Sequence, residues 1–147
     1  MKGIKLLASM MLLLWGCSRD EGKSPTSREI VGTWVSTDGS QFSLKEDGTF
    51  MGSSIPADVF IINMPEYQGK KFDGSGTWAI KKKEEAWDQL PWGIDIDFNS
   101  TSDSDKYKCG TTILISGSGI MENRAPWGYI FKWQDEEGSE RIKFFKK

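Results

Sequence analysis

Hydrophobic and polar residues alternate in short runs along most of the chain that follows the N-terminal segment. In one such run, Ile94, Ile96 and Phe98 are separated by Asp95 and Asp97. Successive side chains of a strand point to opposite faces, so a period of two buries one face and leaves the other in solvent. No stretch beyond the N-terminal segment keeps a helical period over three turns. The pattern therefore predicts an all-β fold.

Eight runs of this kind are separated by residues typical of turns. We expect antiparallel strands at 30–36, 40–45, 49–54, 75–81, 93–99, 111–116, 127–133 and 139–146. Asp47-Gly48, between two of these runs, is a strong hairpin signal. Short antiparallel strands in this number fit a sandwich or an up-and-down barrel. We favour a single closed antiparallel up-and-down β-barrel of about eight strands, which side chains fill or which holds one small ligand.

One long segment, 55–74, does not follow the alternation. It contains the apolar run Val59-Phe60-Ile61-Ile62, with a proline on either side. We expect this segment to form either a short helix that plugs one end of the barrel or a lid over it. Phe60 and Tyr67 are accordingly candidate residues for binding a ligand or a partner.

The first sixteen residues differ from the rest of the chain. Lys2 and Lys5 precede an apolar run, which at about ten residues is too short to cross a ~30 Å hydrocarbon core as a helix. These proportions are typical of a secretory signal peptide. The next polar stretch has no apolar residue that could pack, and predicts a flexible tether. The expected organisation is a signal peptide at 1–16, a lipidated tether at 17–28 and a barrel at 29–147.

The end of the signal segment, Leu14-Trp15-Gly16-Cys17, resembles the lipobox of bacterial lipoproteins. The resemblance implies that Cys17 carries acyl chains, such as palmitate, and anchors the protein to a lipid bilayer. Ser18 after the cysteine implies the outer membrane of the bacterial cell envelope, with the barrel facing the periplasm. The alternative is a secreted protein in which Cys17 and Cys109 form a disulfide.

The composition removes several classes of function. The chain has no histidine and a net charge of −2. Without histidine there is no Ser-His-Asp or Cys-His pair and no histidine ligand for zinc, and the charge gives no footprint for nucleic acid. We therefore expect no enzyme activity, no cofactor and no metal. The remaining catalytic interpretation uses carboxylates such as Asp95 and Asp97, and the simpler interpretation is a solvated strand face.

Gly32-Thr33-Trp34, at the start of the first expected strand, resembles the Gly-x-Trp signature of lipocalins. Together with Asp47-Gly48-Thr49-Phe50 and Gly74-Ser75-Gly76-Thr77-Trp78, it looks like secreted bacterial proteins called lipocalin-like. The resemblance implies that Trp34 seals the closed end of the barrel and that an arginine of the last strands, here Arg141, packs on it. Trp78 is expected in the core of a paired strand.

Trp87 and Trp92 flank a connection where exposure is plausible, and exposed aromatic residues on loops often mark a binding surface. The alternative is a hydrophobic flap over the barrel rim. One functional hypothesis is an anchored protein that binds a small apolar ligand in or at the mouth of the barrel. The other is a protein-interaction module, such as an adaptor or an immunity protein against a toxic effector, that docks an envelope partner through its rim loops. Trp, Phe and Ile at most inward positions favour a filled interior, which shifts weight toward the second hypothesis and leaves the two nearly equal.

Overall fold

The structure is a computed structural model, and it describes residues 23–61, 65–83, 90–102, 109–135 and 137–147. In chain order the elements are α1 (Ser27–Ile30), β1 (Gly32–Ser36), β2 (Gln41–Leu44), β3 (Thr49–Pro56), α2 (Ala57–Phe60), η1 (Pro65–Tyr67), β4 (Lys71–Lys82), β5 (Trp92–Thr101), β6 (Gly110–Gly117), β7 (Trp127–Trp133) and β8 (Arg141–Lys146). The expected signal peptide and Cys17 lie outside the described residues.

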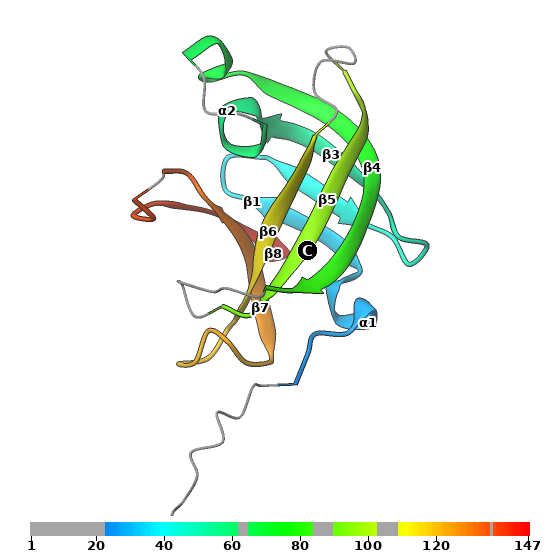
Figure 1. Cartoon of the computed structure of the whole chain (residues 1–147), viewed down its shortest axis with the longest axis vertical. Coiled ribbons are helices and arrows are strands. Elements are labelled where there is room, and N and C mark those ends of the chain that lie inside the picture. Colours follow the sequence, from blue (N-terminus) through cyan, green and yellow to red (C-terminus); the bar gives the residue numbers. More distant parts are fainter. Residues whose placement is uncertain (1–22, 62–64, 84–89, 103–108, 136) are drawn as a thin grey trace, which may run out of the picture.

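The strands form one closed barrel in which every strand pairs with its neighbours in the sequence (Figure 1). All ladders are antiparallel, and β1 closes the barrel by pairing with β8, with Trp34 opposite Lys146. The prediction of an all-β, up-and-down barrel of eight strands is therefore confirmed, and the architecture is consistent with a lipocalin-like fold. Because the strands alternate in direction, α1 and α2 lie at opposite ends (Figure 1).

The segment 55–74 is more regular than its sequence predicts. Its first residues extend β3 and its last residues begin β4, because Ile55 pairs with Phe72 beyond a break in register. Between them, α2 covers one end of the barrel, so the short-helix alternative is the correct one (Figure 1). Phe60 of this helix is 2 % exposed, and its ring centroid lies 5.3 Å from that of Phe42 and 6.0 Å from that of Phe144.

Large side chains fill the barrel interior. Aromatic rings from several strands meet there: Phe42 lies 5.2 Å from Phe144, and Phe98 lies 5.1 Å from Phe50 and 5.2 Å from Phe72. These edge-to-face contacts add to the burial of large apolar surfaces, which is the main source of stability. The same core includes Ile55, Ile94, Ile96, Ile113, Ile115, Ile130 and Trp78.

The end that carries α1 is closed by Trp34. Its side chain is fully buried, and its indole Nε1 donates a hydrogen bond to the backbone oxygen of Ile30 at 2.8 Å. Lys146 reaches the same place: its Nζ lies 5.6 Å from the centroid of the Trp34 ring and donates to the backbone oxygen of Glu29 at 2.9 Å. The tryptophan thus ties α1 to the barrel.

The expectation that Arg141 packs on Trp34 is wrong. Arg141 begins β8, opposite Trp133, whereas Trp34 lies opposite Lys146 at the other end of that strand. The register therefore gives Trp34 a lysine as its cation. The Arg141 guanidinium instead lies on the outside of the barrel, over two aromatic rings of β7.

Candidate functional site

The predicted binding residues lie at two ends of the barrel. Phe60 and Tyr67 belong to the α2 end, where Phe60 is buried and Tyr67 is half-buried against the core. Trp92 begins β5 at the α1 end and packs half-buried against the same core. Trp87 lies outside the described residues. The structure therefore does not bring Trp92 into one site with Phe60 and Tyr67.

The α1 end contains two buried indole N–H groups without a hydrogen-bond partner among the described residues. They are Nε1 of Trp92 and Nε1 of Trp127. Buried donors are nearly always paired, with protein or with an ordered water. Leu90, just before β5, is buried on the outside of the barrel against Leu114 and Phe131. The end of this connection therefore packs against the barrel wall.

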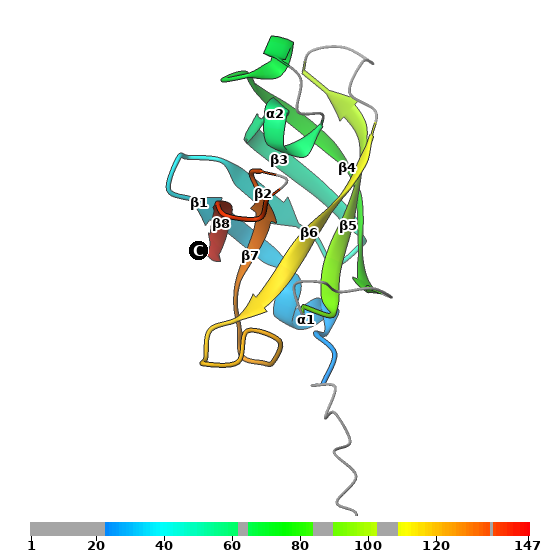
Figure 2. The same cartoon turned by 60° about the vertical axis from the view of Figure 1, so that its left-hand side comes forward.

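The α2 end holds a lysine that faces the interior. Lys132 lies opposite Ile142 on the neighbouring strand and two residues from Ile130, and both isoleucines belong to the core. The ladder between β6 and β7 begins only at Leu114, and Figure 2 shows these strands diverging toward the α2 end. Burial lowers the pKa of Lys132, and it raises the pKa of the Cys109 thiol nearby. Among the described residues no carboxylate pairs with Lys132.

The outer face of β7 carries an aromatic cluster that the sequence analysis missed. The Arg141 guanidinium carbon lies 4.4 Å from the centroids of both Phe131 and Trp133, whose rings are nearly perpendicular at 5.3 Å. Arg141 also donates to Oε1 of Glu122 at 3.0 Å and to the Tyr129 hydroxyl at 3.1 Å. Tyr129, Phe131 and Trp133 alternate in the sequence with the inward Ile130, so apolar residues on both faces of this strand were the available signal.

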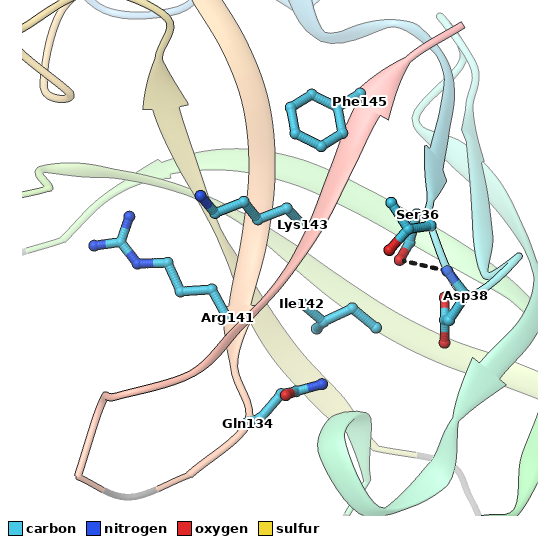
Figure 3. Close-up of a pocket in the computed structure, with 8 residues that line it drawn as sticks. Ser36, Asp38, Gln134, Arg141, Ile142, Lys143 and Phe145 are labelled. Carbon is cyan, nitrogen blue, oxygen red and sulfur yellow. Dashed lines mark hydrogen bonds between the residues drawn. The ribbon is translucent and has the colours of Figure 1, made fainter.

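Next to this cluster, the wall opens into a cleft between β8 and the β1–β2 turn. The ladder between β1 and β8 ends at Ser36, opposite Phe144. There the chain turns, with Ser36 N donating to Ser40 O at 2.9 Å and Gly39 N donating to Ser36 O at 3.1 Å. β8 extends three residues further, paired with β7 alone. The cleft has a volume of about 250 Å³ and is lined by Ser36, Thr37, Asp38, Gln134, Arg141, Ile142, Lys143 and Phe145 (Figure 3).

The register shows which backbone groups of β8 point into the cleft. Lys147 N donates to Thr33 O at 2.8 Å, so the odd-numbered residues of β8 direct their N–H and C=O toward β1. Arg141 and Lys143 are the odd-numbered residues beyond the end of that ladder. Among the described residues, no backbone group forms a hydrogen bond with the N–H or C=O of Arg141 or Lys143.

Charge is distributed unevenly around the cleft. On the β1 side, the Asp38 carboxylate is paired with Lys71 at 3.1 Å. Partial burial disfavours its ionised form, but hydrogen bonds from the Ser40 backbone and hydroxyl, Ser36 and Lys71 together lower the pKa of Asp38 to about 2. On the β8 side, no carboxylate of the described residues lies within ion-pair distance of Lys143. Its ammonium lies 4.9 Å from the Tyr129 ring.

Asp95 and Asp97, the two carboxylates considered as a catalytic pair, lie in different surroundings. Asp95 accepts from Nζ of Lys81 at 2.6 Å and from the Thr112 hydroxyl at 2.7 Å, bridging three strands on the outer wall. Asp97 is exposed on the same face. Among the described residues there is no group of three or more side chains suited to hold a metal ion, and no helix long and apolar enough to cross a membrane.

The chain is thus a closed, eight-stranded barrel with a packed interior. Its outer wall carries an aromatic cluster on β7 and a cleft beside β8. Comparison with models of known protein families, with curated proteins and with solved structures finds no match for this chain.

Proposed function

We propose that this chain is a non-catalytic lipoprotein of the bacterial envelope that docks a protein partner on the outer wall of its barrel. The proposal rests on one observation: the barrel interior is filled, whereas exposed side chains that could contact a partner lie on the outer wall. The interior is occupied by aromatic side chains, from Phe60 at the α2 end to Trp34 at the α1 end. Exposed cationic and aromatic groups are found instead on β8, where Phe145 is 48 % exposed beside Lys143.

The anchoring part of the proposal comes from the sequence. The signal segment and Cys17 support export and attachment to a bilayer, with the outer membrane and a periplasm-facing barrel as the expected location. Two acyl chains give stable anchoring where one gives only marginal binding. The described chain enters the barrel at α1, so the α2 end and the β1–β2 and β7–β8 turns lie at the end away from the tether (Figure 1). A partner can thus reach the cleft without contacting the bilayer.

The experiment is site-specific photo-crosslinking of the full-length, membrane-anchored protein in its own host. A photoreactive phenylalanine analogue replaces Phe145 in one strain and Met51 in another. Met51 is 58 % exposed on β3, so it is a matched exposed control three strands away. We expect a crosslinked protein from position 145 that is absent from position 51. Equal crosslinking at both positions, or none at either, would refute docking on this wall.

A second candidate function is binding of an amphipathic anion at the α2 end, and Lys132 is the observation that favours it. A cation that faces the interior without a carboxylate partner among the described residues suits a ligand carboxylate, with Cys109 and Tyr67 as partly buried neighbours of the core. A dansyl-labelled fatty acid and its methyl ester test this. Lys132→Met should weaken binding of the acid roughly tenfold, about 1.4 kcal/mol, and leave the ester unchanged. Equal effects on both probes would refute it.

A further inference from the structure

We propose that the cleft beside β8 binds an extended, acidic segment of the partner, which adds to the barrel as a short strand next to Arg141–Lys143. This inference rests on the proposed function, because it names the part of the partner that docks. It is based on the unequal lengths of two neighbouring strands and on the charge of the longer one.

The backbone supplies the first reason. β1 stops pairing at Ser36, so Arg141 and Lys143 present two N–H donors and two C=O acceptors that no described backbone group meets. A strand edge with unpaired groups is a template for another strand. A peptide lying where β1 would have continued can form up to four ladder hydrogen bonds with these two residues. Peptide recognition by strand addition derives its affinity from such main-chain bonds.

The space supplies the second reason. The β1–β2 turn leads the chain away from β8 at Ser36 and leaves the cleft of about 250 Å³ beside the free edge (Figure 3). A strand advances about 3.3 Å per residue, so the three free residues of β8 match a partner segment of about three residues. Thr37 and Asp38 form the opposite wall, and the ion pair of Asp38 with Lys71 fixes that wall in place.

The charge supplies the third reason and sets the chemistry of the partner. β8 and the residue after it carry Arg141, Lys143, Lys146 and Lys147 and no carboxylate, in a chain whose net charge is −2. Figure 3 shows Lys143 and Arg141 extending from the same side of β8. A carboxylate on the added strand opposite Lys143 would form a cross-strand pair of opposite charge, which stabilises a ladder. Arg141 already pairs with Glu122, so Lys143 is the cation that selects an acidic residue.

The acidic β7–β8 turn limits where that residue can lie. Asp135, Glu137 and Glu140 precede β8, and Asp135 accepts hydrogen bonds from the Ser139 backbone and hydroxyl. These carboxylates repel an acidic segment that continues past Arg141. The bound segment should therefore place its acidic residue near Lys143 and a neutral residue near the turn.

A lysine at a free edge can also serve a purely protective role, because natural proteins use charged edge residues to prevent edge-to-edge pairing. The two roles predict different results when Lys143 becomes neutral. If the lysine only protects, Lys143→Ala should promote self-association of the barrel and no acidic peptide should bind. If it recognises a partner, Lys143→Ala should weaken binding of an acidic peptide.

The test measures amide hydrogen exchange by NMR on the anchored protein in detergent micelles, with synthetic peptides as probes. One peptide alternates Glu with Val, and its matched control alternates Lys with Val. In the free protein, the amides of Arg141 and Lys143 should exchange faster than those of Ile142 and Phe144, which face β7. The Glu peptide should slow exchange at Arg141 and Lys143 about tenfold, and the Lys peptide should not.

A proline separates the backbone from the side chain. Because the N–H of Lys143 points into the cleft, Lys143→Pro removes no native ladder bond, and proline is tolerated on such edges. It should leave the fold intact and reduce binding of the Glu peptide by roughly tenfold or more. Ile142→Pro is the contrasting control, since its N–H faces β7 and its loss should unfold the barrel. Lys143→Glu, which keeps the backbone donor, should reverse the preference toward the Lys peptide.

Three outcomes would overturn the inference: no slowing of exchange at Arg141 and Lys143, binding unaffected by Lys143→Pro in a folded protein, or no charge preference. These failures differ from failure of the proposed function. If Lys143→Pro leaves crosslinking from position 145 intact, the partner docks on the wall without adding a strand, and only the present inference is wrong. If position 145 gives no crosslink at all, both are wrong.

Discussion

Replacement of Trp34 by alanine tests both the closed end of the barrel and the phase of β1. The Trp34 side chain is 0 % exposed, it packs in the main core, and it ties α1 to the barrel through its bond to Ile30. Trp34→Ala removes the ring, the hydrogen bond and the surface on which Lys146 lies. Each loss can be assigned an approximate size.

Truncation of a buried tryptophan to alanine costs about 3–5 kcal/mol, because the surrounding structure only partly closes the cavity. Loss of the indole donor leaves the Ile30 carbonyl without this partner, which costs about 1 kcal/mol more when water does not replace it. We therefore expect Trp34→Ala to lower the free energy of unfolding by about 4–6 kcal/mol, a large part of the 5–15 kcal/mol typical of a domain. Trp34→Phe keeps most of the apolar surface and should cost about half as much or less.

The assay is equilibrium unfolding in guanidinium chloride, followed by fluorescence and by far-ultraviolet circular dichroism on the same samples. Agreement of the two probes supports a two-state transition, and similar m-values allow the free energies to be compared. A loss below about 1 kcal/mol for Trp34→Ala would mean that Trp34 is exposed and that the phase of β1 is wrong. Equal losses for the alanine and phenylalanine variants would place the whole effect in the hydrogen bond rather than in packing.

Three further predictions use other parts of the chain. Cys17→Ser should release the protein from membranes, and continued pelleting with membranes in high salt would contradict the lipid anchor. Asp38→Asn should lower the free energy of unfolding by about 1 kcal/mol at pH 7. The native pKa of Asp38 is about 2 against an ordinary 3.8, a difference that corresponds to ~2 kcal/mol. Solvent screening reduces this figure, because the side chain is 37 % exposed. A depressed native pKa stabilises above the unfolded pKa, so this difference should shrink as pH falls from about 4 toward 2 in urea titrations; a constant difference would refute it. Gly76→Ala should cost several kcal/mol in thermal unfolding, since its Cβ would lie 1.8 Å from the Asp97 backbone oxygen. Gly119→Ala, with nothing within 4 Å of its Cβ, is the control and should be nearly neutral.

The strands were predictable because most of them follow a strict period of two. The run from Ile94 to Phe98 pairs on both sides in the expected phase. One exception is the end of β3, where Ser54 has φ of 54° and the register shifts between Gly52 and Ile55. A bulge of this kind changes which face successive residues occupy, so alternation stops while pairing continues. The alternation therefore predicted that the strand ends at residue 54, whereas β3 continues to Pro56.

The candidate site was less predictable, because it depends on register rather than on local pattern. The lipocalin resemblance suggested a cation near Trp34 but did not specify which residue lies opposite it. Only the pairing of β1 with β8 shows that Lys146 occupies that place and that Arg141 lies at the other end. The cleft also depends on the register. β1 turns away at Ser36, opposite Phe144, whereas β8 begins at Arg141, three residues before Phe144. No property of either strand by itself predicts that difference.

The unequal strands reconcile a packed barrel interior with the proposed recognition of a partner. A fully closed barrel satisfies its backbone groups internally and offers a partner only side chains. Where β1 leaves the ladder, the wall offers main-chain donors and acceptors beside the cation of Lys143. Main-chain bonds accept any extended segment, whereas the side chains beside them select by charge. Because α1 precedes β1 at the opposite end of that strand, the proposed anchor would lie at the end of the barrel away from this free edge. On this reasoning the filled interior serves as a rigid support, and recognition depends on the part of the wall where closure is incomplete.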